Sequence, residues 1–297
     1  MQMSRGGGGG GGGSRMMSPK QLLTTILIVF SALSFIKLLL ITSSSMAGSA
    51  TSAHHRRESA WGVGGGVNGS AESGLTAKEV ALLRSVVAAR APCRLLVFGL
   101  SPQLLALAKV NSGEGAVTAF VTDSAEDADS ARRVLARRGA ANEAGSAAFH
   151  QVRYRNAAGE AWPLLRRARA NPACRLPTGT VRKSGCHLAL TTLTRELLDA
   201  MWDVLVVDGP SGAGPEEPGR MAAIYTAAAL ARAAAAAGGR QVDVAVHDVD
   251  RTVERWYAWE YLCEDNLVAA KGRLWHFRVA AGGPPDAFCS TGPVQIL

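Results

Sequence analysis

The chain has 297 residues, enough for one domain of ordinary size with appended segments. Apolar residues make up 47% of the chain, but many are alanines, and one apolar block lies near the N-terminus. The formal charge is +8, a balance that suits nucleic acid, anionic lipid or an acidic polysaccharide. The arginines lie on helix-like segments and do not alternate with aromatic residues, so we exclude a nucleic-acid partner. We expect solvated helix faces or an acidic-glycan surface instead.

The chain contains five cysteines: Cys93, Cys174, Cys186, Cys263 and Cys289. No two of them form a CxxC pair, which argues against a zinc ribbon or a thioredoxin-type motif. In an oxidising compartment they allow two disulfides and one free thiol, with the pairing left open. In the cytosol, five buried thiols are expected instead.

The N-terminal part predicts a membrane anchor with flanking segments. Residues 1–20 hold a glycine run and three cations and are expected to be a disordered cytosolic tail. Residues 21–41 include LLTTILIVFSALSFIKLLLI, which is long enough to cross a bilayer as a transmembrane helix. A cleaved signal peptide is the alternative, because AGSA follows Met46. Cations before the helix favour a cytosolic N-terminus and a lumenal remainder, although His54 to Arg57 on the other side weaken this bias.

Residues 42–74 are rich in Ser, Gly and Ala and are predicted to be a flexible lumenal stem. The stem contains an N-glycosylation sequon at Asn68, which is usable only in the lumen. A tail, an anchor, a stem and a globular domain over residues 75–297 form the layout of a resident Golgi enzyme. We therefore expect a single-pass type II protein of the Golgi membrane.

From residue 75 onward, strands alternate with helices. The first helix begins at Thr76, with Glu79 completing a capping box. Further helices are predicted over residues 102–109, 125–138, 221–237 and 252–262. Strands are predicted over residues 94–98, 116–121, 149–154, 204–207, 242–246 and 274–279. Several strands are continuous apolar runs, which predicts a doubly wound α/β domain with a mainly parallel, Rossmann-like sheet.

Ligands of such sheets bind at the carboxyl ends of the strands, so the residues there are candidates. Gly99 follows the first strand and allows the backbone to approach a nucleotide, although a simple tight turn explains it equally well. Asp123 follows the second strand, where an acid can bind ribose hydroxyls or cap a helix. Asp208 follows the VLVV strand and begins an Asp-Gly-Pro turn that is typical of binding sites. We therefore predict that these three residues bind a cofactor.

Two further segments supply candidate catalytic and substrate-binding groups. His247 closes the VDVAV strand beside Asp248 and Asp250, where a histidine next to acids can act as a general base. A purely structural His-Asp pair is the alternative, and the spacing of these three residues does not predict a metal site. Arg220 can bind a carboxylate or phosphate in a bidentate manner, or lie on the surface at a helix start.

Motifs at these same positions resemble a plant family of xylan biosynthesis proteins, the polysaccharide biosynthesis domain family. This family includes the glucuronoxylan 4-O-methyltransferases and the irregular-xylem-15-like proteins. The matching stretches run in order from Leu75 to Cys289: PCRLLVFGL, WDVLVVDGP, PGRMAAIYTAA, VHDVDRTVE, EYLC and FC. Ser101 stands where methyltransferase members have a second glycine, and the Asp208 turn and residues 246–274 look more like the irregular-xylem-15 branch.

The resemblance implies a methyltransferase-like lumenal domain that meets xylan or glucuronoxylan chains and other xylan synthesis proteins. Two hypotheses follow from it. In the first, the protein is required for xylan synthesis in the secondary wall, has no assigned activity and need not be catalytic. In the second, it is an S-adenosylmethionine-dependent glucuronoxylan 4-O-methyltransferase acting on glucuronic acid side chains, with His247 or Asp248 as the base; S-adenosylmethionine is the only cofactor implied.

Overall fold

The computed structural model describes residue 61 and residues 74–137, 147–175, 181–284 and 287–290. The predicted tail, the predicted anchor and the sequon at Asn68 lie outside the described residues, as does the stem apart from Trp61 and Gly74. The indole N–H of Trp61 donates a 3.1 Å hydrogen bond to Asp127. Trp61 of the predicted stem therefore contacts the α/β domain.

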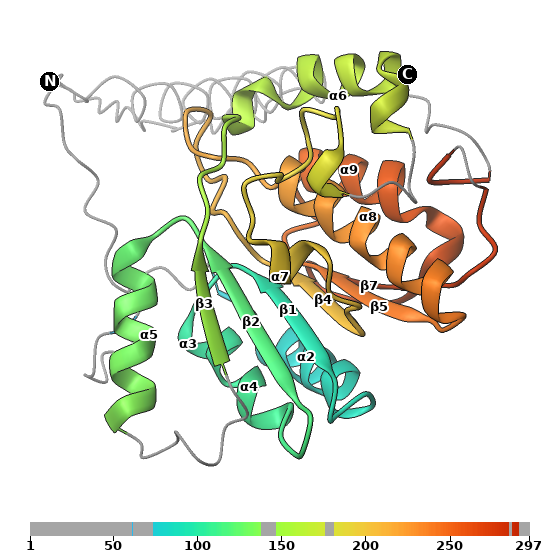
Figure 1. Cartoon of the computed structure of the whole chain (residues 1–297). Helices are drawn as coiled ribbons and strands as arrows, with labels where there is room; N and C mark the ends of the chain where they lie inside the picture. The colour runs from blue at the N-terminus through green and yellow to red at the C-terminus, as the bar shows by residue number, and fades with distance from the viewer. Residues whose placement is uncertain (1–60, 62–73, 138–146, 176–180, 285–286, 291–297) are drawn as a thin grey trace, which may run out of the picture. The chain divides into compact units, whose positions relative to one another are not determined.

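A seven-stranded sheet forms the centre of the described domain, with the strand order β3-β2-β1-β4-β5-β7-β6 (Figure 1). The first five strands in this order are parallel to one another, whereas β7 is antiparallel to both β5 and β6. The bounds are β1 Arg94–Phe98, β2 Val117–Thr122, β3 Ala147–Gln151, β4 Val204–Val207, β5 Val242–Val246, β6 Leu267–Lys271 and β7 Leu274–Val279. The order reverses between β1 and β4, which is where doubly wound sheets bind their ligands. The predicted mainly parallel sheet is confirmed.

Helices cover both faces of the sheet. Leu95 and Val97 of β1 pack into one apolar cluster with α2, α3, α4 and α5, and Leu96 and Phe98 pack into a second cluster with α6, α7, α8 and α9. The helices on the first face are α2 Ala77–Ala88, α3 Pro102–Leu105, α4 Leu107–Val110 and α5 Ala125–Arg137. Those on the second face are α6 Ala161–Ala170, α7 Arg195–Leu198, α8 Met221–Gly238 and α9 Thr252–Leu262. Short 3-10 turns lie at Ala158–Glu160, Pro172–Cys174, Val181–Lys183 and Glu264–Asn266.

Helix α8 is buried along most of its length because it packs against the sheet and α9. Its many alanines keep the helix narrow enough to approach both neighbours closely. Among the described residues, α8 is the one helix long and apolar enough to cross a membrane, but 78% of its apolar window is buried inside the domain. The helix therefore belongs to the protein core.

The predicted bounds of β1, β4, β5, β7 and α9 are confirmed. The single helix predicted over residues 102–109 is wrong, because α3 and α4 are separate short helices that meet at Ala106. The strand predicted to reach residue 154 ends at Gln151, since β3 pairs only with β2 as far as Thr122. Strand β6 was not predicted; this half-exposed edge strand pairs only with β7 and lacks a clear apolar pattern.

Two disulfides join Cys174 to Cys186 and Cys263 to Cys289, which leaves Cys93 as the free cysteine. This pairing realises one of the arrangements that five cysteines allow in an oxidising compartment. Cys93 is buried, and burial raises the pKa of its thiol to about 11. Because the thiolate is the reactive form, burial and this raised pKa disfavour reactions of Cys93.

Asp243 of β5 binds two arginines and a histidine at the amino end of the sheet. Its carboxylate accepts hydrogen bonds from Arg90 Nε at 2.6 Å, Arg278 Nε at 3.0 Å and His276 Nε2 at 2.8 Å, and its side chain is 2% exposed. Burial raises the pKa of Asp243, but the hydrogen bonds from His276, Arg278 and Arg90 outweigh it and lower the pKa from 3.8 to about 2.

We predict that Asp243 stabilises the fold in a pH-dependent way. Its pKa is lower in the folded than in the unfolded state, so the stabilisation is complete above about pH 4 and is lost as the pH falls toward 2. Asp243→Asn should lower the free energy of unfolding at pH 7 by about 2 kcal/mol and flatten its decline in acid. Urea unfolding between pH 2 and 7 measures both effects. Asp129→Asn, in an exposed ion pair, is the control, and equal acid curves for the two variants would contradict the prediction.

Candidate active site

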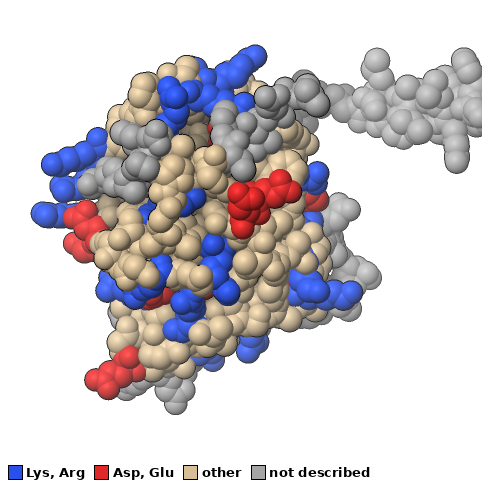
Figure 2. Space-filling model, turned by 90° about the vertical axis from the view of Figure 1, so that its right-hand side faces the viewer, with Lys and Arg blue, Asp and Glu red and all other residues tan. Residues whose placement is uncertain are grey.

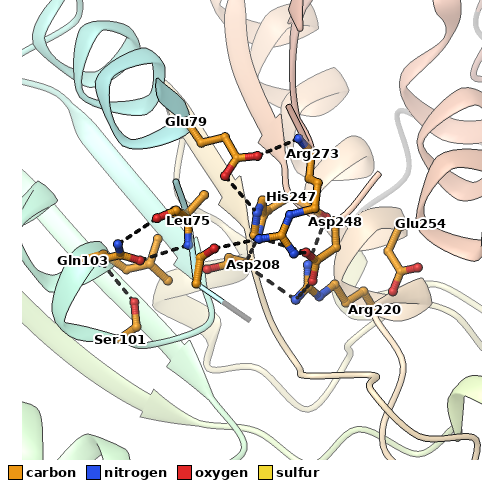
Figure 3. Close-up of polar contacts among 12 residues, drawn as sticks. Leu75, Glu79, Ser101, Gln103, Asp208, Arg220, His247, Asp248, Glu254 and Arg273 are labelled. Atoms are coloured by element: carbon orange, nitrogen blue, oxygen red, sulfur yellow. Dashed lines mark hydrogen bonds and ion pairs between the residues drawn. The ribbon is translucent and has the colours of Figure 1, made fainter. Parts of the chain in front are cut away.

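The carboxyl ends of β1, β4 and β5 meet the start of α2, the start of α8 and the β6–β7 turn in one buried cluster (Figure 3). Parallel strands bring their carboxyl ends to the same edge, which explains why Asp208 and His247 are neighbours although 39 residues separate them. The cluster contains four carboxylates and four cationic or imidazole side chains: Glu79, Asp208, Asp248, Glu254, Arg220, His247, Arg251 and Arg273.

His247 and Asp208 form the closest pair at the centre of the cluster. The Nδ1 atom of His247 lies 2.7 Å from Oδ1 of Asp208. The His247 side chain is 0% exposed, whereas that of Asp208 is 13% exposed. The Nε2 atom of His247 has no hydrogen-bond partner among the described residues and lies 3.6 Å from Glu79. Asp208 is therefore the member of the pair that solvent or a ligand can reach.

Asp248 is surrounded by arginines. One carboxylate oxygen lies 2.8 Å from Arg273, and the other lies 2.8 Å from Arg220 and 3.2 Å from Arg251. Its side chain is 1% exposed, and its φ of 60° lies in the left-handed region that residues other than glycine seldom adopt. A buried carboxylate needs such partners to offset the loss of hydration. The structure thus places Asp248, a predicted catalytic residue, inside an ion-pair network.

Arg220 is not on the surface, and its side chain is 4% exposed. Its Nε donates to the carbonyl of Pro210 at 2.8 Å, and Nη1 donates to the carbonyl of His247 at 2.9 Å. Its Nη2 lies 2.8 Å from Asp248 and 3.6 Å from Asp208. The guanidinium therefore joins the ends of β4 and β5, and its predicted role of binding substrate remains a prediction.

Glu79 and Arg273 join this cluster from segments that the sequence did not connect with it. Glu79 accepts 2.6 Å hydrogen bonds from the backbone N–H groups of Thr76 and Arg273, so the predicted capping box also reaches the β6–β7 turn. Burial raises the pKa of Glu79, but these hydrogen bonds outweigh it and hold the pKa below its ordinary value. Burial raises the pKa of Glu254, and the nearby charge of Arg220 offsets this only in part.

Gly99 is required for a close approach between two turns of the backbone. Its φ is 115°, and an added Cβ would lie 2.9 Å from the carbonyl carbon of Asp208 and from the nitrogen of Gly209. An added Cβ at Gly209 would in turn lie 2.6 Å from Cα of Gly99. The two glycines thus let the turns after β1 and β4 touch, which sets the position of Asp208. Binding of a cofactor by Gly99 stays a prediction.

Asp123 lies beside the helix cap of α5 without forming it. Ser124 Oγ accepts a 3.1 Å hydrogen bond from the N–H of Asp127, so Ser124 caps the helix. The carboxylate of Asp123 is half-buried and forms no hydrogen bond or ion pair with a described residue. It remains available to a ligand at the end of β2. Ser101 likewise acts as a cap, accepting a 3.2 Å hydrogen bond from Leu104 at the start of α3.

Asp250 lies apart from the other predicted catalytic residues. Its side chain is exposed, and only its backbone carbonyl is engaged, by Arg255 at 3.2 Å. Asp208, His247 and Asp248 bring potential metal-ligand atoms within 4.8 Å of one another. However, guanidinium groups engage both oxygens of Asp248, and Asp208 is bonded to His247, so these residues form an ion-pair network rather than an open ligand set.

The close backbone contact at Gly99 leads to a prediction about stability. Gly99→Ala should lower the free energy of unfolding by about 1–3 kcal/mol more than Gly115→Ala, because an overpacked backbone contact must open. Gly115 is the matched control, since its φ is also positive at 82° but nothing lies within 4 Å of an added Cβ. Urea unfolding of both variants measures the difference. Equal losses would show that the turns after β1 and β4 can separate freely.

A second prediction concerns Arg220. Arg220→Ala leaves Asp248 without one of its partners in a buried place, and should lower the free energy of unfolding by about 3–5 kcal/mol. Arg132→Ala removes an exposed ion pair with Asp129 and should cost no more than about 1 kcal/mol. Denaturant unfolding compares the two variants. A loss as small as that of Arg132→Ala would contradict a structural role for Arg220.

Comparison with known proteins matches the chain to one family. The model of the IRX15/IRX15L/GXM family matches residues 78–277. The chain is 39% identical to arabinogalactan O-methyltransferase 2 of Arabidopsis thaliana over 220 residues, which are 71% of each chain. It is 35% identical to glucuronoxylan 4-O-methyltransferase 1 of the same plant, over 68% of this chain and 66% of the relative.

The chain is also 36% identical to irregular xylem 15 of Arabidopsis thaliana, over 63% of this chain and 54% of that relative. Its identity to irregular xylem 15 thus lies between its identities to the two methyltransferases above. Among solved structures, it is similar to the O-methyltransferase TomG of Streptomyces achromogenes, with 14% identity and a TM-score of 0.43 over 71% of this chain and 83% of that one.

Proposed function

The chain belongs to the IRX15/IRX15L/GXM family, and from that premise we propose that it acts in the synthesis of plant cell-wall xylan or arabinogalactan. The proposed place of action is the Golgi lumen, with residues 21–41 as a single-pass type II anchor. The two disulfides support this location, because such bonds persist in oxidising compartments. The sequon at Asn68 is also usable only there.

The activity that we propose is transfer of a methyl group from S-adenosylmethionine to a hydroxyl of a uronic acid on the glycan. The observation that carries it is the His247–Asp208 pair at the carboxyl edge of β4 and β5, next to the point where the strand order reverses. Ligands of doubly wound sheets bind at that point. Relatives that are 39% and 35% identical are named as O-methyltransferases of arabinogalactan and glucuronoxylan.

The residues at the ends of β1 and β2 suit a nucleoside-containing donor. Asp123 offers a half-buried carboxylate without a partner among the described residues, which can accept hydrogen bonds from ribose hydroxyls. When bound, S-adenosylmethionine supplies an electrophilic methyl group on a sulfonium. The remaining demand on the protein is to hold the acceptor hydroxyl in line and remove its proton.

We assign the removal of that proton to Asp208, since it is the exposed member of the pair. The Nδ1–H of His247 donates to Oδ1 of Asp208 and fixes the orientation of the carboxylate, which leaves Oδ2 for the acceptor hydroxyl. The sequence analysis instead predicted His247 or Asp248 as the base and Asp208 as a cofactor-binding residue. Burial of His247 behind Asp208 favours the assignment made here.

A second candidate is an accessory role in xylan synthesis without methyl transfer, carried out by binding glycan or other synthesis proteins. Ser101 favours it, because the side chain caps α3 where a glycine would leave the turn after β1 open. The complete pairing of Asp248 and Arg220 favours it as well. Donor binding separates the two candidates.

The first test is titration of the full-length protein with S-adenosylmethionine by calorimetry. We expect micromolar binding that weakens at least about tenfold in Asp123→Asn, the loss expected for a charge-assisted hydrogen bond. Asp129→Asn, an exposed carboxylate on α5, should bind as tightly as the unchanged protein. Absence of binding by the folded protein would leave the accessory role.

Methyl transfer to glucuronoxylan and arabinogalactan is then measured for Asp208→Asn. Loss of the base should lower kcat by a factor of about 10²–10⁴ while the affinity for S-adenosylmethionine is unchanged. His247→Gln should lower kcat by less, because an amide can still donate to Asp208. Full activity of Asp208→Asn would remove Asp208 from the mechanism.

A further inference from the structure

A basic cleft opens where the chain leaves β3. After Gln151 burial alternates along the chain, so that Val152 and Tyr154 are buried while Arg153 and Arg155 are exposed. Arg153, Tyr154, Arg155 and Thr192 line a cavity of about 370 Å³, and we call these four residues the basic cleft. Its volume falls within the range of about 300–1,000 Å³ that is typical of small-molecule sites.

No ion pair with a described residue neutralises the two arginines of the basic cleft. Neither Arg153 nor Arg155 forms a hydrogen bond or ion pair with a described residue. The lining includes no acidic side chain, and neither does that of the smaller hollow beside it, where His187 and Ala222 join the same two arginines. By contrast, Arg220 of the central cluster is fully paired and buried. Two unpaired guanidinium groups in a concave place favour an anion, and a carboxylate fits their planar fork.

Tyr154, which lines the basic cleft, carries a buried hydroxyl. The residue is 7% exposed, and its hydroxyl has no hydrogen-bond partner among the described residues. Burial raises the pKa of Tyr154 far above its ordinary value, and the charge of Asp123 adds to this, so the hydroxyl keeps its proton and can donate. A buried donor without a partner is costly, and a ligand would satisfy it.

The cleft has a fixed wall and lies next to the candidate active site. The N–H of Leu190 donates a 3.1 Å hydrogen bond to Thr226 of α8, and the Cys174–Cys186 disulfide holds the segment that leads to Leu190. Ala222, in the adjoining hollow, lies two residues after Arg220 at the start of α8. An acceptor held in the cleft is therefore close to the carboxyl edge of the sheet.

We propose that the basic cleft binds the carboxylate of a uronic acid residue on the acceptor glycan, through Arg153 and Arg155. This inference rests on the proposed function for the identity of the acceptor and adds the site that selects it. The carboxylate meets the two guanidinium groups, and the sugar hydroxyls meet Thr192 and the hydroxyl of Tyr154. Neutral xylan or galactan would leave both arginines without a partner, so the cleft discriminates in favour of acidic side chains.

The test is calorimetric titration of the full-length protein with defined oligosaccharides. The probes are a xylo-oligosaccharide and an arabinogalactan oligosaccharide that each carry one glucuronic acid, their neutral parents, and the methyl esters of the two acids. We expect both acids to bind at least about tenfold more tightly than the esters and the parents, with affinity falling as salt rises. If only one of the two acids binds, the protein also recognises the glycan backbone. The difference between that acid and its methyl ester then still supports the carboxylate contact. Equal binding of acid and ester would overturn the inference without any variant.

The variants locate the contact. Arg153→Gln with Arg155→Gln should weaken binding of the acids at least about tenfold, whereas Arg84→Gln, an exposed arginine of α2, should not change it. Binding equal to that of Arg84→Gln would overturn the assignment to the cleft. Inorganic phosphate at the same concentration should compete only weakly, and complete displacement by phosphate would show a general anion site instead.

Titration with S-adenosylmethionine in parallel separates this inference from the proposed function. Uronate binding without donor binding would leave the cleft in place and remove the methyl transfer. Donor binding without uronate binding would support the methyl transfer and overturn the cleft as the uronate site.

Discussion

The ion pairs of the buried Asp248 carboxylate hold the described domain together at the carboxyl edge of the sheet. The residue adopts a left-handed backbone conformation directly after β5, which turns its charge into the protein rather than toward water. Partners must then come from elsewhere, and they come from the start of α8, the cap of α9 and the β6–β7 turn. Elements far apart in the chain are in this way fixed to one another by the need to neutralise a single carboxylate.

This arrangement explains why Asp208 differs from its neighbours. Arg220 engages Asp248 closely and Asp208 only at 3.6 Å, so Asp208 keeps an oxygen free and part of its surface exposed. The rigid network thus supports one accessible carboxylate, which is what a catalytic base requires. In the basic cleft, by contrast, the two arginines have no carboxylate partner among the described residues.

The central strands were predictable because each is a short apolar run buried on both faces, and VLVV and VDVAV are unambiguous in this respect. The meeting of Asp208 with His247 was predictable too, since parallel strands end at one edge. Glu79 and Arg273 were beyond prediction, because their contact joins positions 194 residues apart and each has a sufficient local explanation as a cap or a turn residue. Arg153 and Arg155 belong to none of the motifs found in the sequence, and the cavity beside them is a feature of the folded chain alone.

The contacts around Glu79 also define where the domain begins. The carbonyl of Gly74 accepts a hydrogen bond from Arg273, and the backbone of Leu75 exchanges two hydrogen bonds with the side chain of Gln103. Gly74 and Leu75, which precede the first helix, therefore fasten the start of the domain to α3 and to the β6–β7 hairpin. A shortened version of the protein that begins at the α/β domain needs to retain Gly74, because a chain starting even two residues later would place a free ammonium group among these contacts.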